Sequence, residues 1–367
     1  MKKSMIYIGH SYHLHTQSTR FLIEIFNNAY QIDEVTYDMD TGEFNLFDFN
    51  VNKNYDVLVL FQMPISPAIL KSKFHFKKAA YFPMYDGTGE HPPNFWIEYK
   101  DFNIINFSRT LHNRLLDMGL SSYYIQYYSK PVDKHTFSWG DTEKAFFWQR
   151  TNNITINSII PLLKQLDVTK IHMHIANDPG SHNVQPEKDI SNNFDITTSR
   201  WFDTKSDMYK EVVKSAYYVA PRIYEGIGMS FLEAMAMGRC VIAVNHPTMN
   251  EYILDGVNGL LYNYDKTVLV KPNDVHVLQK NAYESALAGY STWERDKLNI
   301  LLWLEKKISI DKIKFRRTLH TLRFSRVYYF GKLLMLSKSA DEKYFLFGKI
   351  HIPVCVINAA KRIYHLK

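Results

Sequence analysis

Residues 220–262 read APRIYEGIGMSFLEAMAMGRCVIAVNHPTMNEYILDGVNGLLY, and this stretch decides the fold. An apolar strand ends at Pro221 and a glycine-containing turn follows at 225–228; a helix is then predicted at 229–237 and a new apolar strand at 240–244. In a parallel α/β sheet such a turn lies at the carboxyl end of a strand, where ligands bind. The free N–H groups at the start of the helix suit a phosphate, and the glycines let a ligand approach the backbone.

The same alternation of apolar runs and amphipathic segments extends through the chain before this stretch. Short strands are expected at 4–9, 34–37, 56–61, 78–82, 104–107, 123–127, 145–148, 170–175 and 217–220. Helices are expected at 108–119, 156–166 and 205–215. Strands that alternate with helices predict parallel sheets, so the fold class is α/β.

The segment 129–141, SKPVDKHTFSWGD, interrupts this alternation, because it contains Pro, Gly and charges without periodicity. We therefore predict two Rossmann-like domains, at 1–135 and 141–290, followed by a basic helical extension at 291–367. Residues 301–367 hold fifteen Lys/Arg and four Asp/Glu, more positive charge than the net +7 of the whole chain. A basic end on a mildly acidic body indicates an anionic surface as partner.

The composition narrows the class of protein. A hydrophobic fraction of 46% supports a sizeable core, and two cysteines, Cys240 and Cys355, exclude a disulfide framework and indicate a reducing compartment. The first residues lack the apolar stretch of a signal peptide, and no apolar run approaches the roughly 18–20 residues of a membrane span. We expect a cytoplasmic protein, either soluble or peripheral on the inner face of the cytoplasmic membrane.

Two glutamates separated by seven residues, Glu225 and Glu233 in EGIGMSFLEA, carry the main family signal. This pattern resembles the E-G-x-G-x-x-x-x-E-A signature of the retaining GT-B glycosyltransferases of the family 4 type, the glycosyl transferases group 1. The likeness continues through GRCVIA at 238–243 and DGVNGLLY at 255–262, and weakly over most of 1–270. It implies a GT-B fold in which the parallel sheets of the two Rossmann-like domains face an interdomain cleft. The first domain would hold the acceptor and the second the nucleotide sugar.

The resemblance also implies roles for the residues of this motif. Glu233 would accept hydrogen bonds from the ribose hydroxyls of the donor, and Glu225 would contact the hydroxyls of the transferred sugar as a candidate catalytic residue. The backbone N–H groups of Gly226, Ile227 and Gly228 would face the sugar or the diphosphate. Family members usually need no metal, because protein cations and the helix end offset the charge of the departing diphosphate.

The expected phosphate clamp is incomplete. Arg150, in FFWQR, lies where the family has a basic residue that binds the diphosphate, but the Lys that usually follows is missing until Lys164. Lys205 or Arg222 could replace it, and the sequence does not rank them. A plain surface role for Arg150 remains an alternative.

Two further departures concern the donor sugar and the first domain. The family's Gly-Gly is replaced by NHPT at 245–248, which makes His246 a candidate contact of the donor sugar. Where relatives often carry a His-Asp pair, this chain has PMYDG at 83–87, so Asp86 is a second candidate catalytic residue, with a simple turn as the alternative.

Three histidines, His10, His13 and His15, follow the first strand on the side expected to face the acceptor. They are candidate acceptor-side residues or an ordinary polar loop, because no ligand spacing with carboxylates or cysteines supports a metal. Asp38 and Asp40 imitate a metal-binding D-x-D pair, but they read as a solvated turn. No metal or other cofactor is expected.

The sequence thus predicts a hexosyltransferase that moves a sugar from a nucleotide sugar to a lipid-linked glycan in bacterial surface polysaccharide (O-antigen or capsule) synthesis. Apolar and basic residues interleaved at 303–326 suit either a helix surface that closes the fold or adhesion to anionic lipid. Nucleic acid is not expected, because no nucleic-acid motif accompanies the charge. A catalytically silent GT-B-like binding protein and a sugar-nucleotide epimerase of the same fold remain alternatives.

Overall fold

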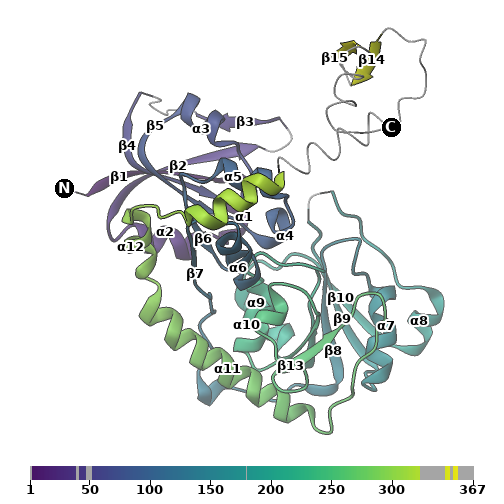
Figure 1. Cartoon of the computed structure of the whole chain (residues 1–367). Helices are drawn as coiled ribbons and strands as arrows, with labels where there is room; N and C mark the ends of the chain where they lie inside the picture. The colour runs from purple at the N-terminus through teal and green to yellow at the C-terminus, as the bar shows by residue number, and fades with distance from the viewer. Residues whose placement is uncertain are drawn as a thin grey trace.

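The computed structural model describes residues 2–38, 41–46, 52–178, 180–322, 344–347 and 350–353. Figure 1 shows two α/β halves, each built on its own sheet, with long green helices that run from the second half back to the first. The division at 290/291 falls inside helix α11 (Val275–Asp296), so the C-terminal helices continue directly from the second half.

The first sheet has seven strands in the order β3-β2-β1-β4-β5-β6-β7. The strands are β1 (Lys3–His10), β2 (Tyr30–Asp38), β3 (Glu43–Asn45), β4 (Asn54–Phe61), β5 (His75–Phe82), β6 (Asn103–Asn106) and β7 (Ser122–Tyr124). All neighbours are parallel except the short edge strand β3, which is antiparallel to β2. The predicted strands of this half are confirmed, and β3 was not predicted.

The second sheet has six parallel strands in the order β10-β9-β8-β11-β12-β13. The strands are β8 (Asp141–Gln149), β9 (Lys170–Ile175), β10 (Asp195–Ser199), β11 (Ser215–Val219), β12 (Cys240–Val244) and β13 (Gly259–Tyr262). This is the order of a classical dinucleotide-binding sheet. Together the two sheets confirm the α/β, GT-B architecture expected from the sequence.

Helices connect the strands and cover the sheets. In the first half they are α1 (Tyr12–Thr16), α2 (Arg20–Phe26), α3 (Pro67–Lys73), α4 (Tyr85–Thr88), α5 (Pro93–Glu98) and α6 (Arg109–Asp117). In the second they are α7 (Ile156–Gln165), α8 (Lys188–Asn193), α9 (Lys205–Val212) and α10 (Met229–Ala236), with one-turn 3-10 helices at Lys134–Thr136 and Met249–Glu251. Ser108 caps α6 by accepting from the N–H of Leu111, and Gly119 follows the helix with φ 79°.

Each sheet has one point at which the direction of strand order reverses. In the first sheet the chain turns between β1 and β4, and in the second between β8 and β11. At such a switch point the loops after the two strands leave to opposite sides, so a ligand can sit at their carboxyl ends. The two switch points are therefore the places at which to look for binding residues.

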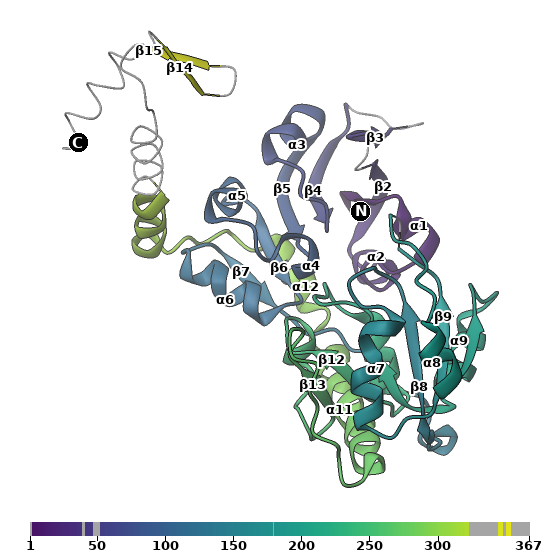
Figure 2. The same cartoon turned by 90° about the vertical axis from the view of Figure 1, so that its right-hand side faces the viewer.

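The C-terminal helices cross back to the first half, as Figure 2 also shows. Trp293 of α11 packs against Phe21 of α2, with ring centroids 5.8 Å apart. In α12 (Asn299–Glu305), Trp303 stacks on Tyr123 at 4.9 Å, and a further helix occupies 312–322. α11 and α12 thus pack against the first half, while the predicted basic extension beyond residue 322 lies outside the described residues except at 344–347 and 350–353.

The end of α12 is fixed by charge. Glu305 accepts hydrogen bonds from Lys3, Lys78 and the Tyr30 hydroxyl, each at 2.7 Å. Partial burial alone would raise the pKa of Glu305, but these three donors lower it to about 2.

Farther along the chain, β14 (Tyr344–Phe347) and β15 (Ile350–Pro353) form an antiparallel pair. None of the helices in the described ranges combines the length and apolar character needed to cross a bilayer.

Candidate functional site

Two arginines and an aspartate meet at the switch point of the second sheet. Arg150 directly follows β8, Arg222 lies three residues beyond β11, and Asp178 lies three residues beyond β9. Asp178 Oδ1 accepts from Arg150 Nε at 3.1 Å and from Nη2 at 2.8 Å, while its Oδ2 accepts from Arg222 Nη2. One carboxylate thus bridges two guanidinium groups at the carboxyl ends of three parallel strands.

The first half contributes a second carboxylate to this cluster. Asp86, in the first turn of α4, accepts from Arg222 Nη1 at 2.8 Å through its Oδ2. Arg222 is therefore shared between the two halves, with Asp178 on one side and Asp86 on the other. Burial raises the pKa of Asp86, although the Arg222 charge opposes the shift.

The glycine turn lies against the same segment of the first half. A Cβ built on Gly226 would come within 2.9 Å of the Met84 Cβ and within 3.0 Å of Asp86 Oδ1, which is closer than real side chains approach. Only glycine fits here, and the two halves are in direct contact at this point. Gly228 adopts φ 77° and serves as N-cap of α10. The side chain of Ile227 is buried, so only its backbone can face a ligand.

Glu225, at the start of this turn, is 5% exposed, and burial raises the pKa of its carboxyl group, with Arg222 and Arg150 opposing. Its Oε1 atom has no hydrogen-bond partner within the described ranges, and neither does Arg222 Nε. Buried polar atoms are nearly always paired in native proteins. Asp86 Oδ1 is likewise without a partner in the described part of the chain, so two acceptors and a donor are left unsatisfied in this cluster.

Glu233 lies one turn into α10 and is also buried. Its carboxylate accepts from Lys205 Nζ, at the start of α9, and from the Tyr209 hydroxyl. Burial raises the pKa of Glu233, while these two partners lower it. The structure thus separates the two candidates for the missing Lys: Lys205 pairs with Glu233, and Arg222 joins Arg150.

His246 lies beside the turn that carries Glu225. Its ring packs on Tyr224 with centroids 4.8 Å apart, and Tyr224 in turn lies 6.0 Å from Tyr85 of the first half. The backbone N–H of Glu225 donates to the Pro247 carbonyl at 3.3 Å. The NHPT segment therefore supports the turn from the side of β12.

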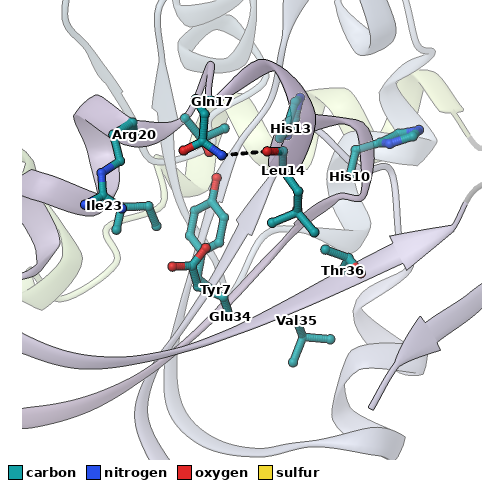
Figure 3. Close-up of a pocket in the computed structure, with 12 residues that line it drawn as sticks. Tyr7, His10, His13, Leu14, Gln17, Arg20, Ile23, Glu34, Val35 and Thr36 are labelled. Carbon is teal, nitrogen blue, oxygen red and sulfur yellow. Dashed lines mark hydrogen bonds between the residues drawn. The ribbon is translucent and has the colours of Figure 1, made fainter. Parts of the chain in front are cut away.

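His10 and His13 of the first half line a pocket formed by β1, β2, α1 and α2, next to the other switch point but on the side of β1 away from β4 (Figure 3). His10 and His13 surround it together with Tyr7, Gln17, Arg20 and Glu34. Burial lowers the pKa of His13 to about 4, helped by the charge of His10, so the His13 ring is neutral near pH 7. The side chain of His15 lies outside the described part of the chain.

Tyr12, between these histidines, connects the pocket to the charged cluster. The pKa of its hydroxyl is raised first by burial and then by the negative charge of Asp178. Tyr12 on α1 of the first half therefore faces the charges of the second half. Both switch points thus open toward the same region between the halves.

A further contact joins the halves next to the site. Glu251 of the second half accepts from Ser108 Oγ at 3.0 Å and from the backbone N–H groups of Arg109 at 2.6 Å and Thr110 at 2.9 Å. A carboxylate at the positive end of α6 is favourable, so this contact holds the halves together.

Sequence reasoning missed Asp178, Tyr12 and the capping role of Glu251. Asp178 lies in NDPG, just after the strand predicted at 170–175, and a polar residue at the carboxyl end of a parallel strand is a signal that could have revealed it. A metal site is a separate matter. Within the described ranges, no group of three or more His, Cys, Asp or Glu side chains is arranged to hold a metal ion.

The sequence and the fold were compared with known families and solved structures. Residues 147–280 match the family model of the glycosyl transferases group 1. None of the curated proteins matches the sequence.

Solved structures share the fold over most of the chain. Sucrose-phosphate synthase from Thermosynechococcus elongatus is 14% identical, with a TM-score of 0.57 over 82% of this chain and 97% of that one. A glycosyltransferase from Rickettsia africae is 13% identical, with a TM-score of 0.53 over 83% and 99% of the two chains. HepE from Anabaena, solved in complex with UDP-glucose, is 11% identical, with a TM-score of 0.52 over 82% and 99%.

Proposed function

We propose that this chain, in which residues 147–280 match the family model of the glycosyl transferases group 1, is a glycosyltransferase that takes a hexose from a nucleotide sugar and transfers it with retention to a lipid-linked glycan. The proposal places the donor at the switch point between β8 and β11 and the acceptor beside the pocket at β1 and β2. The following paragraphs give its support.

The observation that carries this proposal is the pair of unsatisfied atoms, Glu225 Oε1 and Arg222 Nε. A sugar hydroxyl can donate to the first, and a phosphate oxygen can accept from the second. A nucleotide sugar brings both groups on one molecule, with the sugar joined directly to the diphosphate. The site therefore has the complementary atoms for the bond that is to be broken.

The surrounding residues bind the other parts of the donor, namely the diphosphate and the ribose. Arg150 and Arg222 bind the diphosphate, since guanidinium groups pair with phosphate oxygens in a fork geometry. The N–H groups of Gly226 to Gly228, at the start of α10, add a positive dipole end. Glu233, farther along α10, binds the ribose hydroxyls, and its ion pair with Lys205 opposes the rise in pKa that burial causes. His246 supports the sugar side of the turn.

The chemistry follows from this placement. The bond between the anomeric carbon and the diphosphate oxygen breaks, and the acceptor hydroxyl attacks the same face, which gives retention. The hydroxyl proton passes to the departing phosphate oxygen, while the two guanidinium groups stabilise the charge that develops there. Glu225 and Asp86 hold the sugar hydroxyls in position, and this orientation supplies the rest of the rate enhancement.

Incubation with a panel of UDP-, GDP- and dTDP-sugars tests this function. Because HepE was solved with UDP-glucose, UDP-hexoses are the first members of the panel. Transfer to an acceptor or slow hydrolysis of one donor is the expected result. Conversion of a donor to its epimer would support the epimerase alternative, and absence of turnover and of binding would support a silent protein.

Glu233→Gln tests the donor site, because it removes the charge while it keeps the shape. We expect donor affinity in calorimetry to fall at least tenfold, as buried charged hydrogen bonds are among the strongest. Glu187→Gln, an exposed change in the same half, is the matched control and should leave affinity unchanged. Equal affinity of the Glu233 variant and the control would refute the assignment.

The acceptor proposal is a glycan of the O-antigen or capsule type, carried on lipid at the inner face of the cytoplasmic membrane. Leu302 and Ile313 are 69% and 67% exposed and lie near basic residues of the same segment, namely Lys306, Lys307, Lys312, Lys314, Arg316 and Arg317. Exposed apolar side chains between cations suit an anionic lipid surface.

Removal of residues 323–367 tests the membrane contact, because it leaves α12 and its Glu305 contacts in place. We expect weaker co-sedimentation with vesicles containing anionic lipid than for the full chain. Equal co-sedimentation would place the contact on 302–317, and neutralisation of Lys312, Arg316 and Arg317 would then have to abolish it. If neither change weakens binding, the membrane proposal fails.

A further inference from the structure

We propose that, in the ligand-free protein, the carboxylate of Asp178 occupies the position at which the donor diphosphate binds. The donor then binds by displacing this carboxylate from Arg150 and Arg222. The inference rests on the proposed function, since it requires a diphosphate-containing donor. Beyond the proposed function, it assigns a role to Asp178. This residue acts as an anion that exchanges with the diphosphate, and it thereby sets the affinity for the diphosphate product.

Asp178 makes the contacts that a phosphate group would make. Its Oδ1 accepts from Nε and Nη2 of Arg150 in a fork, and its Oδ2 accepts from Arg222 Nη2. Asp86 also pairs with Arg222, whereas Asp178 contacts both guanidinium groups. The position from which one anion touches both cations is therefore already filled.

The charges of the cluster make simultaneous occupancy unfavourable. Two guanidinium groups, Arg150 and Arg222, face three carboxyl groups, Asp86, Asp178 and Glu225. A nucleotide sugar adds two negative charges, and like charges at close range in a partly buried site repel strongly. Binding therefore requires that one carboxylate leave, and the one that bridges both arginines is the one whose place the diphosphate takes.

The local backbone permits this exchange. Asp178 lies in the coil between β9 and α8, and its own N–H donates to the Arg150 carbonyl at 2.9 Å. That bond can persist while the side chain rotates about its Cα–Cβ bond. A Cβ built on nearby Gly180 would meet no atom within 4 Å, which shows open space next to the segment. Asp86 instead belongs to a helical turn that packs against Gly226.

The exchange has a consequence for turnover. After transfer, the nucleoside diphosphate carries more negative charge than the donor and would be held tightly by two arginines. Return of Asp178 to its bridging position competes with the product and speeds its departure. Release of product limits many transferases, so Asp178 acts as a positioning residue for the arginines and as a release device.

Asp178→Asn tests the proposal, because it keeps the shape and removes the charge. Calorimetry with UDP, GDP, dTDP and inorganic pyrophosphate should show about tenfold tighter binding to this variant than to the unmodified protein. Product inhibition by the same diphosphate should strengthen in parallel, and kcat should fall while the donor KM also falls. Asp265→Asn, an exposed change of equal charge in the second half, is the control. It should leave the diphosphate affinity, the product inhibition, kcat and the donor KM unchanged.

The outcomes separate this inference from the proposed function. If the unmodified protein binds a diphosphate and Asp178→Asn binds it equally or more weakly, Asp178 only orients the arginines and the inference is wrong. If the unmodified protein binds none of the probes, the donor site itself is wrong and both proposals fall. Asp178→Ser, which removes both charge and reach, must show the same tightening and replaces the Asn variant if that one does not fold.

Discussion

The two switch points have the same topology and opposite chemistry. At β8 and β11 the strands end in charges, with Arg150, Arg222 and Asp178 in direct contact. Beside the ends of β1 and β4, the His13 ring, which is neutral near pH 7, packs on Phe61 with centroids 5.3 Å apart. The first arrangement can stabilise a leaving diphosphate, whereas the second brings a neutral ring against an aromatic one. In the proposed function, one scaffold serves two partners through the residues that follow its strands.

The largest effect is expected when one residue near each switch point is substituted separately. Arg222→Gln removes the cation that faces the diphosphate, so we expect kcat/KM for the donor to fall on the order of 10²–10³-fold. His13→Ala should leave the donor constants unchanged and raise the acceptor KM, because its pocket lies in the other half. Steady-state kinetics with each substrate varied in turn measure both. Equal effects of the two changes on donor kinetics would remove the division of labour.

The charged switch point was largely accessible from sequence, whereas in the first sheet the sequence pointed to His10 and His13 but not to the pocket that they line. Glu225 and Glu233 stand eight positions apart in one local motif, so their spacing predicts their place on turn and helix. The choice between Lys205 and Arg222 depends on how α9 and β11 pack, which no local pattern records. β10, with the sequence DITTS, escaped prediction because an edge strand needs no apolar run.

The second prediction concerns how closely the halves approach. Gly226→Ala places a methyl group against Met84 and Asp86 and forces the charged turn away from the first half. A displacement of about 1 Å at a reacting centre costs on the order of 10²-fold in rate, which we expect in kcat. Gly87→Ala is the control, since a Cβ there meets nothing within 4 Å. Wild-type kcat in the Gly226 variant would show that this contact is not used in turnover.

The third prediction uses pH. Burial raises the pKa of Glu225 and of Asp86, and a bound diphosphate beside them raises both further, so donor binding takes up protons. Donor affinity should therefore rise several-fold as pH falls from about 8 toward the ordinary carboxyl range near 4. The charges that face these groups are Arg150, Arg222 and Asp178.

Calorimetry in two buffers of different ionisation enthalpy counts those protons. His13 should contribute no change in the acceptor KM from about pH 6 to 8, because its pKa lies near 4 and its ring remains neutral over that range. Donor affinity that rises with pH would contradict the sign of the expected shift.

The smallest effect is expected far from both switch points. Glu305 pairs with Lys3 at the start of β1, at the end of the sheet opposite to the pocket. Its pKa, about 2, lies below the ordinary value of 4.5, so its stabilisation is present above pH 4.5 and is lost as pH falls toward 2. Glu305→Gln should cost about 1 kcal/mol of unfolding free energy at pH 7, after allowance for solvent screening, and much less at pH 2–3.

Thermal melts of both proteins across this pH range measure the difference, and kcat/KM per folded molecule should not change. A cost that persists undiminished at pH 2–3 would mean that Glu305 acts through packing and not through charge. A fall in kcat/KM would mean that the packing of α12 against the first sheet affects the residues at the switch points. The contrast between the two ends of the first sheet would then be wrong.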